Sequence, residues 1–224
     1  MFERNINLIG EKKFNEFKTK KVLIVGIGGV GGYALETLVR SGFINIDIVD
    51  FDKIDITNLN RQIITNQSNV SEIKTIEAKK RATNINPDIN INTHEIFLDK
   101  NNIKDILSNN FDYIIDACDS IETKVELIKY SIENDIKIIS SMGTAKKLDP
   151  TKLIITSLDK TNYDPLAKVM RKKIKELKIN LKKVKVVSST EIPIKCDTLG
   201  SFMMVPASAG ILCAKYIIDD ILND

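Results

Sequence analysis

Cysteine and histidine are scarce in this chain, and their scarcity argues against several kinds of site. The 224 residues include three cysteines and one histidine. The cysteines, Cys118, Cys196 and Cys213, form no CxxC pair, so the sequence predicts no structural zinc and suggests a reducing cytosol. The histidine, His94, lies in a strand-like alternation without a catalytic setting. We therefore expect no zinc site and no chemistry that depends on histidine.

The chain also lacks a continuous apolar run long enough to be a clear membrane span. The N-terminal segment mixes charges and has no apolar core, which is unlike a secretory signal or an acid-free transit peptide. The least polar late stretch, residues 202–218, is short for a span and is interrupted by Pro206 and Lys215. We expect this stretch to form a buried helix, and the protein to be cytoplasmic without a membrane partner.

No linker rich in proline, glycine or serine divides the chain, so we expect a single domain over residues 1–224. Short apolar runs alternate with segments of helical period, which favours parallel strands joined by crossover helices. The predicted strands are 22–27, 44–50, 89–97, 112–118, 137–142, 153–158 and 184–189. The predicted helices are 30–41, 71–84, 101–108, 121–134 and 165–178, followed by the C-terminal helix. The predicted class is α/β, a mostly parallel sheet with helices on both faces.

A glycine cluster directly follows the first predicted strand. Gly26, Gly28 and Gly31 complete G-x-G-x-x-G, and Gly29 and Gly32 add to it. Glycine permits a tight turn and lets backbone N–H groups approach a phosphate at the positive end of a helix dipole. The order strand, loop, helix therefore predicts a Rossmann-like nucleotide-binding part over residues 22–150. The alternative is a glycine turn that serves only close packing of strand and helix.

The acidic and basic residues after the second strand distinguish between nucleotides. Asp50 ends that strand and suits a ribose, in NAD enzymes and adenylate-forming enzymes alike. Arg61 and Lys74 suit the charge of a triphosphate and its departing pyrophosphate. A hydride-transfer enzyme usually needs an acid–base residue, for which His94 is no candidate. ATP is thus favoured over NAD, although Asp50 as a strand cap and the two cations as surface charges remain alternatives.

These motifs resemble the ubiquitin-activating-enzyme-like superfamily, which adenylates carboxylates. The resemblance rests on GIGGVG at 26–31, D-x-D at 50–52, NLNRQ at 58–62, Lys74, INP at 85–87 and DACDS at 116–120. It implies an ATP-binding fold with a C-terminal part over 151–224 and a helical arm over 1–21. It implies nucleotide contacts from the residues Gly26, Gly28, Gly29, Gly31, Asp50, Asp52 and Asn58.

The same resemblance implies catalytic roles for four residues. Arg61 and Lys74, with Asn58, would bind the phosphates, and Asp119 would meet magnesium and the reacting centre. Arg4 resembles an arginine that the neighbouring protomer inserts into the site, which implies a homodimer, and the alternative is an ordinary N-terminal charge. Asp119 has a second interpretation as N-cap of the following helix. Ser71 stands where the superfamily commonly has glycine, which weakens the assignment of Lys74.

Later blocks resemble one branch of the superfamily, the tRNA threonylcarbamoyladenosine dehydratases. These blocks are 140–153, 159–175, 186–193 and 200–210, and the paired cysteines of sulfur-carrier activators are missing. The resemblance implies ATP- and Mg²⁺-dependent cyclisation of the modified base beside the anticodon, and leaves open a monovalent cation and a sulfur-transfer partner. Adenylation of a ubiquitin-like sulfur carrier is the alternative. A non-enzymatic scaffold that binds nucleotide or tRNA is the third hypothesis.

A basic segment supports an RNA substrate independently. Residues 165–185 carry nine of the 33 basic side chains and one of the 30 acidic ones. Helical spacing predicts a buried face made by Leu166, Val169, Met170, Ile174 and Leu177. It predicts a tRNA-binding face made by Lys168, Arg171, Lys172, Lys175 and Lys178. Solvated charge and a membrane-surface helix are the alternatives. For Cys196, a redox or sulfur-handling role stands against an incidental thiol.

Overall fold

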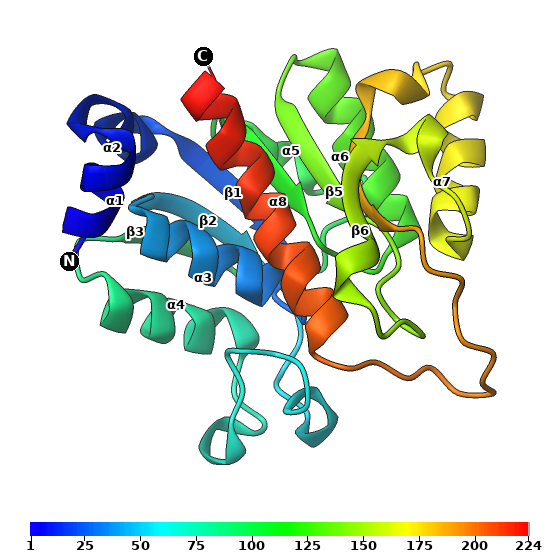
Figure 1. Ribbon diagram of the computed structural model, residues 1–224, viewed down its shortest axis with the longest axis horizontal. Coiled ribbons are helices and arrows are strands. Elements are labelled where there is room, and N and C mark those ends of the chain that lie inside the picture. Colours follow the sequence, from blue (N-terminus) through cyan, green and yellow to red (C-terminus); the bar gives the residue numbers. More distant parts are fainter. Residues whose placement is uncertain (224) are drawn as a thin grey trace.

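The computed structural model describes residues 1–223, in which one seven-stranded sheet passes through the molecule (Figure 1). The strand order is β3-β2-β1-β4-β5-β7-β6, and every neighbouring pair is parallel except β6 with β7. The strands are β1 Lys21–Val25, β2 Asn45–Val49, β3 Asn90–His94, β4 Tyr113–Asp116, β5 Lys137–Ser141, β6 Leu153–Ser157 and β7 Lys185–Ser189. The sheet therefore unites both predicted parts of the chain.

Helices cover both faces of this sheet. They are α1 Glu3–Ile9, α2 Glu11–Thr19, α3 Gly31–Ser41, α4 Lys74–Ile85, α5 Ile103–Leu107, α6 Ile121–Glu133, α7 Pro165–Glu176 and α8 Met204–Asn223. Buried residues of α2, α3, α4 and α8 pack in one core cluster, and those of α5, α6 and α7 pack in a second. The predicted class, a mostly parallel α/β sheet between two helical layers, is confirmed.

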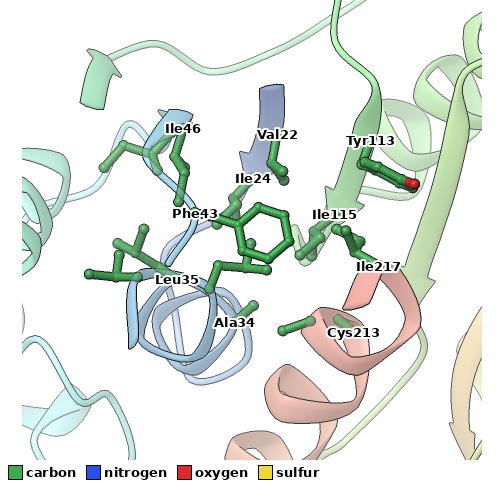
Figure 2. Packing of buried hydrophobic residues seen from close by; sticks show 14 of the residues in the cluster. Val22, Ile24, Ala34, Leu35, Phe43, Ile46, Tyr113, Ile115, Cys213 and Ile217 are labelled. Atoms are coloured by element: carbon green, nitrogen blue, oxygen red, sulfur yellow. The ribbon is translucent and has the colours of Figure 1, made fainter. Parts of the chain in front are cut away.

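Alternation along the strands explains why both faces are apolar. In β1, Val22 and Ile24 join the first core, whereas Leu23 and Val25 join the second. A strand that is buried on both faces needs apolar side chains at every position, which is why it reads as a continuous hydrophobic run. Figure 2 shows the first core, where Phe43 lies between the strands and the two helices α3 and α8.

The N-terminal arm is two short helices that meet at Gly10, whose φ of 81° turns the chain between them. The Lys13 ammonium donates to the carbonyl of Ile221 at 2.9 Å, which ties the arm to the end of α8. Because α2 leads directly into β1, the arm lies at the amino end of that strand. The arm is therefore at the edge of the sheet opposite the glycine turn.

The C-terminal helix agrees with its prediction, and the buried face of α7 agrees only in part. The predicted C-terminal helix is present as α8 and is largely buried against the sheet. In α7, Met170 and Ile174 are buried as predicted, but the prediction was wrong for Val169 and Leu177, which are exposed. Ala167 fills the space instead, so the buried stripe of α7 is narrower than helical spacing predicted. Within residues 1–223, no helix combines the length and apolarity that a membrane crossing requires.

Candidate active site

The glycine turn links the end of β1 to the start of α3 through two sterically enforced positions. Gly26 has a φ of 89°, and a Cβ there would meet the carbonyl oxygen of Ala117 at 2.7 Å. A Cβ on Gly31 would lie 1.8 Å from the carbonyl oxygen of Gly26. These two glycines therefore allow the strand, the turn and the helix to pack closely. Gly26, Gly28 and Gly29 also line a cavity.

This cavity has a volume of about 790 Å³ and lies at the carboxyl ends of β1, β2 and β4. The strand order reverses between β1 and β4, which is where open α/β sheets bind ligands. Most of the predicted residues meet here, namely Gly26, Gly28, Gly29, Asp50, Asp52, Arg61, Lys74 and Asp119. The fold thus brings into one cavity predicted residues that are separated by up to about ninety positions along the chain.

Two carboxylates and a lysine form the acidic side of the cavity. Asp50 is buried, and its carboxylate accepts the backbone N–H of Ile27 at 2.6 Å and that of Asp52 at 2.8 Å. Burial raises the pKa of Asp50, against the opposing effects of the nearby Lys74 charge and these two N–H groups. The buried Lys74 ammonium donates to Asp52 at 2.7 Å. Since Lys74 begins α4, a second helix N-terminus adds positive potential to the cavity.

Arg61 and Asn58 come from the same short segment but take different positions. The Arg61 guanidinium donates to the carbonyl of Thr57 and to the Asn60 side chain, each at 2.9 Å, and lines the cavity. Asn58 is buried, and its side-chain oxygen accepts the backbone N–H of Asp55 at 3.1 Å in a capping box. Asn58 therefore shapes the loop and does not line the cavity, and the phosphate contact expected of it stays a prediction.

The turn after β4 exposes Asp119 to the cavity. Ser120, not Asp119, caps α6, because its hydroxyl oxygen accepts the backbone N–H of Thr123 at 3.2 Å. The alternative interpretation of Asp119 as the N-cap is therefore excluded. Its carboxylate is exposed on the cavity wall, where a ligand or a hydrated cation can reach it.

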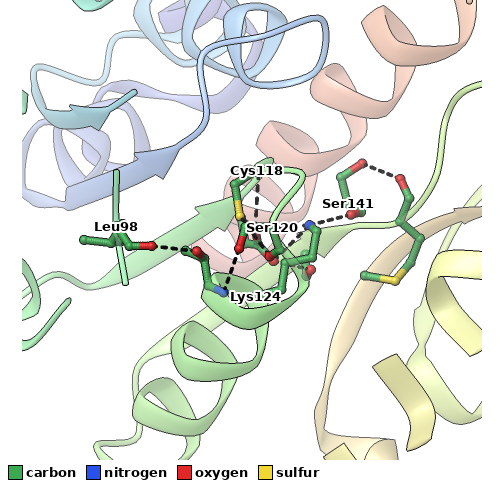
Figure 3. Close-up of polar contacts among 9 residues, drawn as sticks. Leu98, Cys118, Ser120, Lys124 and Ser141 are labelled. Carbon is green, nitrogen blue, oxygen red and sulfur yellow. Dashed lines mark hydrogen bonds and ion pairs between the residues drawn. The ribbon is translucent and has the colours of Figure 1, made fainter. Parts of the chain in front are cut away.

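A buried ion pair lies beneath this turn (Figure 3). The Lys124 ammonium donates to both carboxylate oxygens of Asp116 at 3.1 Å and to the carbonyl of Ser141 at 2.9 Å. Asp116 also accepts the hydroxyl of Ser140 at 2.5 Å and the backbone N–H of Cys118 at 3.3 Å. The network joins β4, β5 and α6, and so fixes the turn that carries Asp119.

Comparison with known proteins identifies the family. The ThiF family profile matches residues 2–223. The chain belongs to the ThiF family. It is 36% identical over 242 residues to the tRNA threonylcarbamoyladenosine dehydratase of Bacillus subtilis (strain 168), covering 100% of this chain and 95% of that protein. It is 34% identical over 213 residues to the enzyme of the same name from Escherichia coli (strain K12), covering 95% and 78%.

A solved structure extends the similarity to three dimensions. The E. coli tRNA N6-threonylcarbamoyladenosine dehydratase in complex with ATP matches with a TM-score of 0.94 and 33% identity, covering 99% of this chain and 93% of that one. These comparisons confirm the Rossmann-like fold and the family resemblance that the motifs predicted.

One departure from the family pattern has a backbone explanation. Ser71 has a φ of 73°, a left-handed conformation that glycine adopts without a steric penalty. Its backbone N–H donates to the carbonyl of Ile54 at 2.8 Å, which holds the segment before Lys74 in place. The serine therefore preserves the loop of this ThiF-family chain, and Lys74 still reaches the cavity.

Two groups of predicted residues lie away from the cavity. Arg4 is exposed on α1, at the opposite edge of the sheet, and does not line the cavity of its own chain. Of the basic side chains on and after α7, Lys168, Lys172, Lys175 and Lys178 are exposed. Arg171 is half-buried and donates to the carbonyl of Thr161 at 2.9 Å and to its hydroxyl. Arg171 therefore holds the loop that contains Thr161, and its guanidinium has less freedom to contact a phosphate than the exposed lysines have.

Sequence reasoning missed part of the cavity wall. Phe51 and Phe97 pack edge to face with ring centroids 5.1 Å apart and line one end. Gln62 is buried, and its side-chain oxygen has no partner among the described residues. Leu199 and Ser201 close another side from the segment before α8. Phe51 and Phe97 follow the carboxyl ends of β2 and β3, where ligands bind in open α/β sheets, so the sequence could have predicted them as cavity residues. The sequence of residues 190–203 has no local pattern that predicts their path to the cavity.

Proposed function

We propose that this chain is an ATP-dependent tRNA threonylcarbamoyladenosine dehydratase, which cyclises the modified base beside the anticodon. The observation that carries the proposal is the single cavity that gathers the glycine turn, Asp50, Arg61, Lys74 and Asp119 in a chain similar over its whole length to enzymes of that name. A tRNA substrate implies a cytoplasmic enzyme.

The cavity has a place for each part of ATP. The N–H groups near Gly28 and Gly29, at the start of α3, suit the phosphates. Asp50 keeps lone pairs beyond its two backbone contacts and suits the ribose hydroxyls. The apolar end beside Phe51 and Phe97 suits the adenine. The unpartnered oxygen of Gln62 offers an acceptor to a ligand.

Asp119 fits a magnesium site of the kind that a nucleotide completes. Mg²⁺ commonly keeps several waters and takes one or two carboxylates together with substrate phosphates. Asp119 supplies such an exposed carboxylate on the cavity wall. Within residues 1–223, no group of three His, Cys, Asp or Glu side chains could hold a metal alone. Bound there with ATP, Mg²⁺ would offset phosphate charge.

The first chemical step needs positioning more than proton transfer. The threonyl carboxylate is ionised at neutral pH, so it can attack the α-phosphorus of ATP without a general base. The bond to the α-phosphorus forms as the bond to pyrophosphate breaks. Arg61, Lys74 and the N-terminus of α3 offset the negative charge that gathers in this step. The products are an acyl-adenylate and pyrophosphate.

The second step is intramolecular. An atom of the ureido group attacks the activated carbonyl, the ureido group releases one N–H proton to solvent, and AMP leaves with one oxygen of the former carboxylate as the ring closes. Effective molarities of about 10⁵ M or more are known for well-oriented groups, so holding the substrate supplies much of the acceleration. A cysteine nucleophile is not required, and burial raises the pKa of the Cys118 thiol well above its ordinary value. We assign no role to a sulfur-transfer partner or a monovalent cation.

A second copy of the chain would complete the site. Arg4 lies on the exposed arm at the far edge of its own sheet, so it could reach a cavity only in a neighbouring protomer. This supports a homodimer in which each arm serves the other site. Light scattering of native protein and an Arg4→Ala variant tests it, with a dimer in both and loss of turnover in the variant as the expected result.

The deciding experiment combines the protein with ATP, Mg²⁺ and tRNA that carries the linear modification. Digestion to nucleosides should show loss of one water from the modified base, together with AMP and pyrophosphate. Pyrophosphate exchange only with a carrier protein ending in Gly-Gly would favour the sulfur-carrier alternative. Bound ATP without turnover would favour the scaffold.

A matched pair of variants separates chemistry from docking. Arg61→Ala should abolish turnover while tRNA still binds. Lys172→Ala together with Lys175→Ala should weaken tRNA binding and reduce its salt dependence, because two phosphate contacts are lost. Unchanged affinity of the double variant at several salt concentrations would exclude this face as the docking surface.

A further inference from the structure

Tyr163 combines exposure with an unusual backbone conformation. The residue is 62% exposed, and its φ is 57°. For a bulky residue, the left-handed region is a real outlier, and such outliers persist where the surrounding structure enforces them. Among the aromatic pairs of residues 1–223, none includes Tyr163. The ring is therefore presented to solvent at a backbone position that asparagine or glycine would occupy more easily.

The residues on both sides of Tyr163 are fixed. On one side, the Asp164 carboxylate accepts the backbone N–H of Ala167 at 3.0 Å and the ammonium of the buried Lys147 at 3.0 Å. On the other side, Arg171 donates to Thr161. Two polar anchors thus hold the loop on either side of the exposed ring. The backbone at Tyr163 is therefore already ordered before a ligand binds.

The loop lies at the same edge of the sheet as the cavity. The start of α7 is placed there by Gly143, which follows the carboxyl end of β5, because a Cβ on Gly143 would lie 3.3 Å from the carboxylate of Asp164, the N-cap of α7. Gly143 directly precedes Thr144, which lines the cavity. Tyr163 directly precedes the N-cap of α7, at the same edge of the sheet as the cavity and on the segment that leads into the helix with the exposed lysines.

We propose that the Tyr163 ring stacks on an unpaired nucleobase of the RNA substrate while the modified base enters the cavity. The inference rests on the proposed function. Proteins recognise single-stranded RNA by stacking splayed bases on aromatic rings, and the bases of an anticodon loop are available for it. The lysines of α7 would hold backbone phosphates, and the uncharged ring would hold a base next to the modified one.

Three variants test the proposal by anisotropy with a labelled anticodon stem-loop RNA that carries the linear modification. Tyr163→Asn removes the ring yet suits the left-handed backbone, so the fold should be retained. We expect its dissociation constant to rise about 5- to 100-fold, as for the loss of one stacked base. Tyr163→Phe keeps the ring and should bind like the native protein. Lys172→Ala should weaken binding and also lower the salt dependence.

The salt dependence distinguishes stacking from electrostatics. Tyr163→Asn should leave the slope of log Kd against log salt unchanged, because it removes no phosphate contact, and should raise the KM for tRNA by a similar factor. Native-like affinity of Tyr163→Asn, or a loss in Tyr163→Phe as large as in Tyr163→Asn, would overturn the stacking role. If the native protein dehydrates the tRNA in that case, the proposed function stands alone. Absence of dehydration by the native protein would overturn the proposed function itself.

Discussion

The buried Lys124–Asp116 pair gives the sharpest prediction of stability. The exposed fractions of the two side chains are 1% and 0%, so neither charge has solvent to replace its partner. Lys124→Met keeps most of the side-chain length but leaves the Asp116 carboxylate with only neutral donors. Removing one member of a buried pair costs about 3–5 kcal/mol, because an uncompensated charge remains. That is a large part of a typical free energy of unfolding of about 5–15 kcal/mol.

The pH dependence identifies the cause. Burial is the largest influence and lowers the pKa of Lys124, but the charge and hydrogen bond of Asp116 together with the nearby Cys118 and Asp119 outweigh it, so the net shift is upward. The stabilisation by Lys124 is thus fully present below pH about 10.5 and is lost as the pH rises through the folded-state pKa. Lys124→Met lacks this titration, so the deficit of the variant relative to the native protein should shrink as the pH rises above about 10.5.

Calorimetry of the native protein and the variant measures this. In a chain of this size, each kcal/mol of lost stability lowers the Tm by about 2–4 °C. We therefore expect the Tm of Lys124→Met to lie roughly 6–20 °C below that of the native protein near neutral pH. Lys129→Met, on the same helix but partly exposed, is the control and should stay within about 0.5 kcal/mol of native. A Tm of Lys124→Met within 2 °C of native, or a deficit that does not change with pH, would refute the reasoning.

Three further predictions follow from single residues. Ser71→Gly should raise the free energy of unfolding by about 0.5–1 kcal/mol, because removing the steric cost of the left-handed backbone exceeds the conformational entropy that the added glycine loses on folding. Urea titration measures the change, and a loss of stability would argue against strain at this position. Cys196 is exposed, so it should react rapidly with a thiol reagent at pH 8. Cys118 lines the cavity but should react slowly, because its raised pKa keeps the thiol protonated. Mass mapping that finds Cys118 modified first would contradict this. Burial raises the pKa of Asp50, so the ATP affinity of the native protein should fall on acidification at a pH above 3.8, the ordinary pKa of this carboxyl group. Asp50→Asn should bind ATP weakly and with a smaller pH dependence. Equal pH profiles of the two proteins in calorimetric titrations would exclude Asp50 as the ribose acceptor.

The sequence was sufficient for the sheet because burial on both faces imposes a local signal. A short apolar run such as residues 22–25, followed by a glycine turn, is typical of a strand buried between two helical layers. Gly31 is needed where the helix meets the turn. Asp50, Arg61 and Lys74 were found because they follow strands or motifs at fixed distances. The physical rule behind this success is that carboxyl ends of parallel strands share one edge.

Local patterns were ambiguous where two residues could do one task. Asp119 and Ser120 are both good N-caps, and only the hydrogen bond to Thr123 assigns the cap to Ser120. Asn58 matched a motif, but the capping box uses its side chain within the loop. The buried face of α7 was too wide in the prediction, because periodicity does not report how deeply a helix sits.

Long-range placement was beyond the sequence. Residues 190–203 pass from β7 to α8 and bring Leu199 to the cavity, a path that depends on tertiary contacts such as the Asn60 side chain donating to the carbonyl of Ser201 at 3.0 Å. The buried Lys147–Asp164 pair was equally hidden, because charged residues are expected at the surface.

The fate of one oxygen atom tests the central claim most directly. The substrate is tRNA whose threonyl carboxylate carries oxygen-18, and the nucleotide products are analysed by mass spectrometry after turnover with ATP. Attack of the carboxylate on the α-phosphorus predicts that AMP carries one heavy oxygen and that pyrophosphate carries none. Heavy oxygen in inorganic phosphate with ADP as the nucleotide product, or AMP without the label, would contradict adenylation of the carboxylate in this cavity.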